Sequence, residues 1–528
     1  MIKPYQIFLL LLIVFILLII PSFLVPSTGL NISSRKIYYP EISYFLRLHS
    51  SEAKNQSLVP EVAYLDKIID TTDIISLVLD SITKNKQYTS SEIVVDTIAI
   101  STDNSKQFNI DWLKSKLVRL EFPDSTRSSL DTFFEALRSG ETNRNLVRII
   151  HYGDSQIEGD RITSFLRKKF QNRFGGTGIG LMHIEPGGYQ TGTVSQLPSS
   201  NWELITLLDK DLGHPEINRY SAFGGYSRFT SPITLFSSGG TPEAWIQIKR
   251  TGNKNNPARN FTRFKLFFGY NSKPFLLELK ISGETIDADM ISPAPMLKQL
   301  NWDIPASYKS FDLKFTGDDS PMIFGISLES EKGIVVDNIP LRGSSGTEFT
   351  RNDISFMKDM LNSLNTKLII LQFGVNVVPN IVADYRYYEN LLYKQIVALK
   401  NAKPNVSIVL VGVSDVSRKE GMEYNSYPNI EKIRDAQRKA AFRAGIPFWD
   451  CYKAMGGKNS MTAWTFANPP LANKDFIHFT PRGARLIAEM FYSALMAEYE
   501  IYLDYFGQSQ ISYVSGTGII RSDHKNGL

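Results

Sequence analysis

The chain has 528 residues and a formal net charge of +5 at pH 7, and 43% of its residues are hydrophobic while 21% are charged. This composition is that of a globular protein of two or three domains, and it excludes a largely disordered chain. The small charge excess, without a basic run interleaved with aromatic residues, argues against a nucleic-acid partner.

The first 26 residues predict a membrane-associated segment. Lys3 precedes the apolar run IFLLLLIVFILLII (7–20), and the hydrophobic stretch continues to Val25. Its length reaches about the 20 residues that span a bilayer, and its charged start also fits a secretory signal. Because no convincing cleavage site follows, we favour an uncleaved signal anchor over a cleaved signal peptide. We therefore expect a single-pass protein of the cell membrane whose remainder is extracytoplasmic, either periplasmic or on the cell surface.

Residues 27–144 predict a linker or small N-terminal region to which we assign no function. TTDIISLVLDSI (71–82) and SSLDTFFEALRSG (128–140) are typical of short helices. SEIVVDTIAIS (91–101) alternates like a strand.

An α/β domain is predicted to open at residue 145. LVRIIHY (146–152) is a short, nearly continuous apolar run, as in a strand buried on both faces. Apolar residues then recur at helical spacing in 158–176, where Gly175 fits a helix stop. Buried strands and amphipathic helices alternate in this way along the rest of the domain, and such alternation predicts a doubly wound parallel sheet. The further strands are expected at 367–376, 407–415 and 446–450, and the further helices at 385–401, 429–445 and from Pro481 onward.

An inserted β-sandwich is predicted to interrupt this domain. Period-two segments such as EAWIQIKR (243–250) and FLLELKISG (275–283) are separated there by turn-rich stretches. We expect the ends of the insert to return to the sheet on either side of the catalytic opening, and the insert to supply no catalytic group. The expected domains are thus 145–184 and 331–505 for the α/β parts, 185–330 for the insert and 506–528 for a loosely ordered tail.

The single cysteine, Cys451, follows the last predicted strand. It excludes an intrachain disulfide and a thiolate metal cluster, and we expect it to be a small buried side chain.

Polar residues follow three of the predicted strands. They are Gly153-Asp154-Ser155, Gly374-Val375-Asn376 and Ser414-Asp415. In an open parallel sheet, ligands bind beyond the carboxyl ends of the strands, so these residues are expected to meet. Any one of the three motifs alone is an ordinary turn after a strand.

Asp475 and His478 lie three residues apart, just before the last helix. A serine becomes a nucleophile when an imidazole takes its proton and a carboxylate orients that imidazole. Ser155, His478 and Asp475 therefore form a candidate catalytic triad. We expect Asp154 to order its turn rather than to take part in the chemistry.

These motifs together resemble the SGNH (GDSL-type) hydrolase family. Ser155 matches the family's nucleophile, Asn376 its oxyanion asparagine, and Asp475 with His478 its Asp-x-x-His block. DNIPLRGSSG (337–346) resembles the second block and implies Gly343, with Gly346 as the alternative, as the backbone oxyanion donor. Two residues depart from the pattern, Val377 where many members carry Asp and Pro340 where many carry a small residue.

The resemblance implies a serine esterase with Ser155, Gly343 and Asn376 as oxyanion donors and with neither metal nor cofactor. The interrupted domain is similar to that of peptidoglycan O-acetylesterases. We therefore expect an exported enzyme that removes O-acetyl groups from a cell-envelope or other polysaccharide, such as acetylated peptidoglycan. An O-acetyltransferase with the same triad and a catalytically inactive polysaccharide-binding or assembly protein are the alternatives. Trp202, Tyr226 and Trp245 are candidates for stacking on sugars, although core packing is the commoner use of such residues.

Overall fold

The computed structural model describes residues 30–32, 35–37, 118–209, 218–229 and 241–516. The predicted membrane segment, the predicted helix at 71–82 and the predicted strand at 91–101 lie outside these residues. Within the described ranges, no helix combines the length and the apolar character needed to cross a membrane.

A five-stranded sheet, all of whose strands are parallel, confirms the predicted α/β class. Numbered by chain order, its strands run 2-1-3-4-5, a common order of doubly wound folds. The first strand in space is an edge strand that was not expected from the sequence. In spatial order the strands are β16 (Gly333–Pro340), β3 (Leu146–Gly153), β17 (Thr366–Gln372), β18 (Ser407–Val411) and β21 (Phe448–Trp449).

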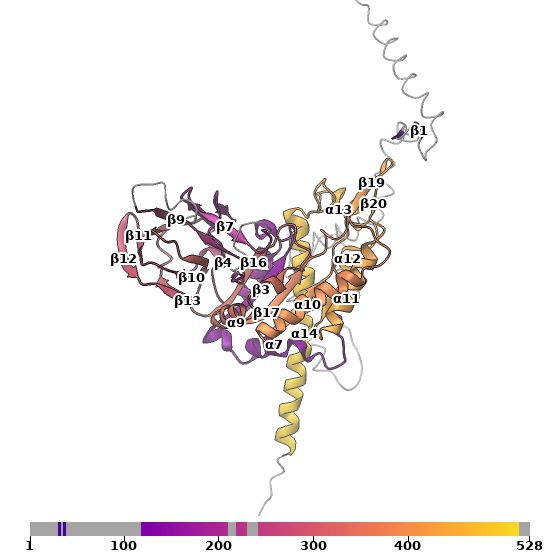
Figure 1. Cartoon of the computed structure of the whole chain (residues 1–528). Coiled ribbons are helices and arrows are strands. Elements are labelled where there is room, and N and C mark those ends of the chain that lie inside the picture. The colour runs from indigo at the N-terminus through magenta and orange to yellow at the C-terminus, as the bar shows by residue number, and fades with distance from the viewer. Residues whose placement is uncertain (1–29, 33–34, 38–117, 210–217, 230–240, 517–528) are drawn as a thin grey trace, which may run out of the picture.

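Helices cover both faces of this sheet (Figure 1). Successive side chains of a strand point to opposite faces. Accordingly, Ile149 of β3 lies in the hydrophobic cluster with α7, α8 and α14, whereas Ile150 lies in the cluster with α9, α10 and α11. The helices are α7 (Asp131–Arg138), α8 (Thr163–Phe174), α9 (Ile354–Ser363), α10 (Arg386–Ala402), α11 (Ile430–Arg443) and α14 (Pro481–Gly516).

The helices expected within the described part of the chain are present at nearly the expected bounds. Helix α8 ends before Gly175, whose φ of +75° is a conformation that glycine adopts without strain. Helix α14 continues to Gly516, beyond the boundary expected at 505, and its last turns project from the α/β lobe in Figure 1.

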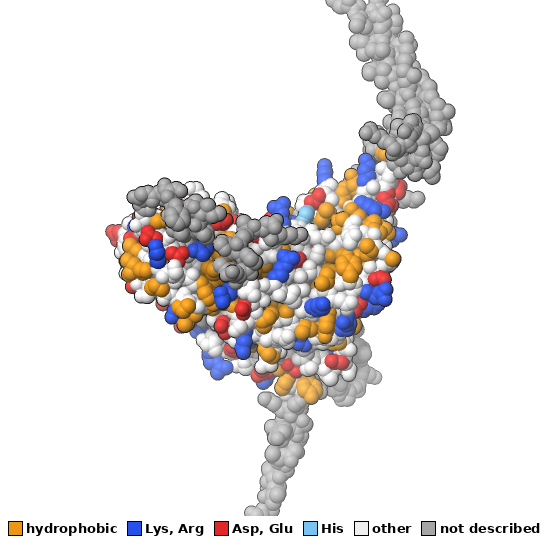
Figure 2. All heavy atoms as spheres, viewed as in Figure 1, with side chains coloured by type: hydrophobic (Ala, Val, Ile, Leu, Met, Phe, Trp, Pro, Cys, Tyr) orange, Lys and Arg blue, Asp and Glu red, His pale blue; other side chains and the backbone are white. Residues whose placement is uncertain are grey.

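Two six-stranded antiparallel sheets form a second lobe, the sandwich lobe, which stands beside the α/β lobe in Figure 1. A cluster of buried apolar side chains fills the space between the two sheets. In Figure 2 a notch separates the two lobes, and on the face shown acidic and basic side chains are interspersed. One sheet contains β4 (Gly180–Met182), β7 (Glu203–Thr206), β8 (Gly225–Arg228), β10 (Arg263–Asn271), β13 (Ala294–Asp303) and β15 (Met322–Glu329), and the other β5 (Tyr189–Gln190), β6 (Val194–Pro198), β9 (Glu243–Arg250), β11 (Phe275–Ile281), β12 (Glu284–Ile291) and β14 (Ser310–Thr316).

Short elements complete the described chain. Cys451 begins one of them and is fully buried and unpaired, in agreement with the role expected for it. These elements are β1 (Leu30–Ile32), β2 (Arg35–Ile37), β19 (Ser417–Glu420), β20 (Glu423–Ser426), α12 (Cys451–Met455), α13 (Ser460–Thr465), η1 (Ser128–Leu130), η2 (Glu141–Asn143), η3 (Glu158–Asp160), η5 (Pro257–Arg259) and η6 (Phe349–Arg351).

The chain enters and leaves the sandwich lobe at one place, the amino end of β16. Gly175 accepts a hydrogen bond from the Ile334 N–H, and a Cβ atom on Gly176 would lie 2.3 Å from the Ile334 carbonyl oxygen. Gly176 therefore cannot be replaced without moving the backbone. The two crossings lie side by side at the edge opposite the polar motifs. This corrects the expectation that they flank the catalytic opening.

The sandwich lobe shares its core with the α/β lobe. Strand β15 is buried along its whole length because both of its faces are covered. Ile326 points into the cluster between the two sandwich sheets, whereas Phe324 packs on Phe356 of α9 with ring centroids 4.6 Å apart. Separation of the lobes would expose these apolar side chains to water.

A buried charge cluster also joins the lobes. Arg148 of β3 donates to Asp337 of β16 at 2.5 Å and to Glu329 of β15, and Lys265 of β10 pairs with Glu329 at 2.6 Å. The side chains of Arg148, Asp337 and Glu329 are at most 1% exposed. Buried charges of this kind are tolerated only when they are paired.

We expect Glu329→Gln to lower the free energy of unfolding by about 3 kcal/mol, because Arg148 and Lys265 lose an ionised partner inside the protein. Glu331→Gln is the matched control. Glu331 is 73% exposed and pairs with Arg263 at 3.6 Å, so its loss should cost about 0.5 kcal/mol. Urea unfolding of both variants measures the difference. Equal, small losses would contradict the role given to the buried cluster.

Candidate active site

The candidate site lies at the carboxyl edge of the parallel sheet. Ser155 follows β3 and Asn376 follows β17, the neighbouring strands at which the strand order reverses. Ligands of doubly wound folds bind at this position because the connections of the two strands diverge to opposite faces. The Leu341 N–H, just after β16, donates to the Gly153 carbonyl oxygen at 2.7 Å and holds the loop of Gly343 beside the Ser155 loop.

Ser155, His478 and Asp475 form one chain of hydrogen bonds. The Ser155 Oγ lies 2.8 Å from the His478 Nε2, and the His478 Nδ1 lies 2.8 Å from the Asp475 Oδ2. A carboxylate only accepts, so the Nδ1 carries the proton and leaves the Nε2 to accept from the serine hydroxyl. This is the arrangement in which an imidazole can take a proton from serine.

Asp475 is held ionised by its own loop. Burial by itself raises the pKa of Asp475, but hydrogen bonds from the His478 N–H, the His478 imidazole and the Ile477 N–H outweigh it and bring the pKa below its usual value. Both backbone N–H groups donate to the Asp475 Oδ1, at 2.9 Å from Ile477 and 3.0 Å from His478. The carboxylate is therefore ready to stabilise an imidazolium.

The backbone N–H groups of Ser155 and Gly343 have no acceptor among the described residues. Gly343 is exposed and has a φ of +82°, which favours glycine. The Asn376 side chain donates from its Nδ2 to the Ser344 carbonyl oxygen at 2.8 Å, which ties Asn376 to the Gly343 loop. An amide nitrogen has a second N–H, so Asn376 retains a donor for a ligand.

Gly346, the alternative oxyanion glycine, is already engaged. Its N–H donates to the Ser344 Oγ at 2.8 Å, and a Cβ atom on Gly346 would lie 2.7 Å from the Phe373 ring. The geometry therefore favours Gly343 as the donor of this loop.

Asp154 does more than order its own turn. Its Oδ1 accepts from the Gln156 N–H at 3.0 Å, and its Oδ2 accepts from the N–H groups of Gly374 at 3.1 Å and Val375 at 3.3 Å. This side chain therefore ties the serine loop to the loop of Asn376. Burial raises the pKa of Asp154 to about 6, although the three backbone hydrogen bonds act to lower it.

The third strand-end motif contributes differently. Asp415 is fully buried and accepts from the Ser426 hydroxyl at 2.9 Å and from the Met461 N–H at 2.8 Å, so it positions α13 and β20. Ser414 accepts from the Gln156 side chain at 3.2 Å. Gln156 was not among the residues expected at the site, because its place next to Ser155 is its only signal in the sequence.

The aromatic residues proposed for sugar contacts divide into two kinds. Trp202 and Tyr226 are 5% and 2% exposed and pack in the core, where Trp202 makes an edge contact with Phe315. Trp245 of β9 is 40% exposed on the outer face of its sheet.

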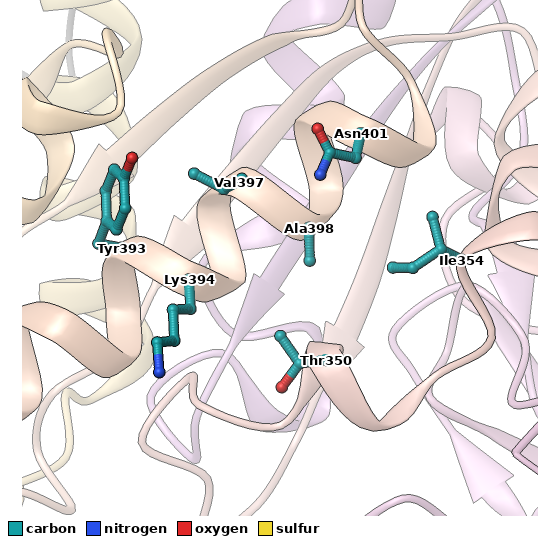
Figure 3. A pocket seen from close by; sticks show the side chains of 7 residues that line it. All are labelled: Thr350, Ile354, Tyr393, Lys394, Val397, Ala398 and Asn401. Carbon is teal, nitrogen blue, oxygen red and sulfur yellow. The ribbon is translucent and has the colours of Figure 1, made fainter.

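A hollow of ≈ 280 Å³ lies between α10 and the η6–α9 segment (Figure 3). It contains no serine, histidine or carboxylate, so it lacks the groups that ester cleavage requires. Its lining consists of Thr350, Ile354, Tyr393, Lys394, Val397, Ala398 and Asn401.

A doubly wound sheet with a Ser-His-Asp chain at its carboxyl edge defines a serine hydrolase of the α/β class. Residues 316–486 match the GDSL-like Lipase/Acylhydrolase family. Over these residues the chain is similar to that family, and the match together with the triad supports a hydrolase of the SGNH type.

One solved structure agrees with this fold. A peptidoglycan O-acetylesterase matches with a TM-score of 0.56 and 20% identity, over 72% of this chain and 99% of that one. A family two carbohydrate esterase from Clostridium thermocellum (8% identity, TM-score 0.21, 50% of this chain and 94% of that one) and an acetyl xylan esterase (19%, 0.24, 30% and 81%) match too weakly to support an argument. No curated protein matches the chain.

The raised pKa of Asp154 predicts a pH-dependent contribution to stability. Between the usual pKa and about 6 the folded state binds more protons at this group, so its contribution to the free energy of unfolding falls as the pH rises. We expect the stability difference between wild type and Asp154→Asn to change by about 2 kcal/mol in favour of Asn from about pH 4 to about pH 7. Urea unfolding across this range measures it, and a difference independent of pH would contradict the assignment.

Proposed function

We propose that the protein is an exported serine esterase that removes O-acetyl groups from a cell-envelope or other polysaccharide through an acyl-serine intermediate. The observation that carries the proposal is the hydrogen-bonded chain from Ser155 through His478 to Asp475, beside two N–H groups without an acceptor. This series of hydrogen bonds prepares the serine hydroxyl to give up its proton during a reaction.

In the first step the Ser155 Oγ attacks the carbonyl carbon of the acetyl ester while the His478 Nε2 takes the hydroxyl proton. The negative charge that develops on the carbonyl oxygen faces the N–H groups of Ser155 and Gly343 and the amide of Asn376. Donors fixed in advance at such a position stabilise the transition state by a few kcal/mol each, on the order seen in other hydrolases. The bond to the sugar oxygen then breaks, and His478 returns the proton to that oxygen.

In the second step water replaces the sugar. His478 takes a proton from the water, and the resulting hydroxide attacks the acetyl group on Ser155. The bond to the Oγ then breaks to release acetate while His478 returns the proton to the Oγ, which restores the free enzyme. Asp475 remains ionised and stabilises the imidazolium in both steps, in line with its lowered pKa.

Three observations support a glycan substrate outside the cytoplasm. The solved structure with the highest of the TM-scores given above is a peptidoglycan O-acetylesterase. Trp245 offers an exposed aromatic face on the sandwich lobe, and sugar rings stack on such faces. The apolar segment at 7–20 fits a signal anchor, which would hold the enzyme at the cell membrane near an envelope polymer.

We expect Ser155→Ala to lower kcat for an aryl acetate by about 10⁴-fold or more and to abolish labelling by a fluorophosphonate, because the nucleophile is removed. Ser363→Ala, which alters an exposed serine at the end of α9, is the control and should keep wild-type activity. Acetate release from an O-acetylated polysaccharide tests the substrate class in parallel. Wild-type rates in the Ser155 variant would disprove the nucleophile, and transfer of acetyl to an added sugar rather than to water would favour the acetyltransferase.

We expect Asn376→Ala to lower kcat by about 100-fold with little change in KM, because its amide acts mainly on the transition state. Asn380→Ala is a matched control four residues away, since Asn380 is exposed and the one hydrogen bond described for its side chain goes to the Tyr387 hydroxyl at 3.1 Å. Steady-state kinetics with an aryl acetate separate the two constants. A raised KM with an unchanged kcat would make Asn376 a substrate-binding residue instead.

A further inference from the structure

We propose that Gln156 is a positioning residue that holds the general base His478 in line with Ser155. The inference rests on the proposed function, because it presupposes that these two residues act as base and nucleophile. Gln156 lies outside the residues matched by the family, 316–486, and outside the motifs identified in the sequence.

Gln156 fixes the peptide unit that precedes the His478 side chain. Its Nε2 donates to the Ile477 carbonyl oxygen at 2.6 Å. The N–H of the same peptide unit, which belongs to His478, donates to the Asp475 Oδ1 at 3.0 Å. The unit is therefore held at both ends, by Gln156 from the serine loop and by Asp475 from the histidine loop, and its rotation is prevented.

The Gln156 side chain is itself rigidly placed. It is 2% exposed, its backbone N–H donates to Asp154, and its Nε2 also donates to the Ser414 Oγ at 3.2 Å. Both N–H groups of the amide are thus in use. The Oε1 is buried without a partner among the described residues, and the amide cannot be turned around because the Ile477 oxygen only accepts. Placing both donors leaves the buried Oε1 without a hydrogen bond. A buried acceptor without a partner is uncommon in folded proteins, so the position of this amide requires a structural explanation.

The reason lies in how the histidine loop is held. Asp475 and His478 belong to the same loop, so their mutual bond does not fix their distance from Ser155. The Phe476 carbonyl accepts from the Ser417 N–H at 3.1 Å, which anchors the loop to β19 but not to the serine loop. Between residues 153–160 and 471–480 the described hydrogen bonds are two, the Ser155–His478 bond itself and the Gln156–Ile477 bond. Gln156 therefore sets the Ser155–His478 distance independently of the reacting bond.

The test compares Gln156→Leu with Gln171→Leu. Gln171 is a matched control: it is 3% exposed, its Nε2 donates to the Gly178 carbonyl at 2.9 Å, and its Oε1 is also unpartnered. We expect Gln156→Leu to lower kcat for an aryl acetate by about 10- to 100-fold with KM unchanged, because a displacement near 1 Å costs up to that much. Gln171→Leu should stay within about twofold of wild type at a temperature where both are folded. Equal rates in the two variants would overturn the proposal.

A double-mutant cycle with His478→Ala separates positioning from a general structural effect. If Gln156 acts through His478, Gln156→Leu should add less than about twofold to the loss caused by His478→Ala. Losses that multiply would show that Gln156 acts elsewhere and would overturn the proposal. Wild-type rates in Ser155→Ala or His478→Ala would overturn the proposed function together with this inference. Inactive Ser155 and His478 variants beside a fully active Gln156 variant would overturn the inference alone.

Discussion

The pairing of β3 with β16 on one side and β17 on the other is the constraint on which the site depends. Because the three strands are parallel, their carboxyl ends meet at one edge, and the loops that carry Ser155, Gly343 and Asn376 become neighbours. The Asp154 N–H donates to the Gln372 carbonyl at 3.2 Å, which continues the pairing one residue beyond the strand. The serine thus directly follows a strand that is hydrogen-bonded on both sides.

The histidine arrives by a different route, and hydrogen bonds between loops compensate for this. His478 lies on a loop before α14, far from β3 in sequence, and no strand pairing places it. The side chains on either side of Ser155 make the connections: Asp154 reaches the loop of Asn376, and Gln156 reaches the loop of His478. Burial of the Asp154 carboxylate is unfavourable, as its raised pKa indicates. The connection that defines the catalytic geometry therefore lowers the stability of the folded protein.

The sandwich lobe is part of the same folded unit. Its core continues into the α/β lobe through Phe324 and Phe356, and the charge cluster around Arg148 crosses the boundary. The chain crosses to this lobe at the amino end of β16, so the carboxyl edge of the sheet is left to the loops of the α/β lobe. No member of the triad therefore comes from the sandwich lobe.

Local patterns in the sequence determined the α/β class, the helices and the residue types of the site. The apolar run at 146–152 predicts a buried strand, and Ser155, Asp475 and His478 are recognisable by residue type and spacing. The tertiary structure decided what depends on partners distant in the chain: the edge strand β16, the engagement of Gly346, the cluster around Arg148 and the role of Gln156. Gln156 and Ile477 are 321 residues apart, so no local spacing connects them. A periodicity reports which face of an element is buried, whereas the partner of a buried amide is chosen only when the loops pack together.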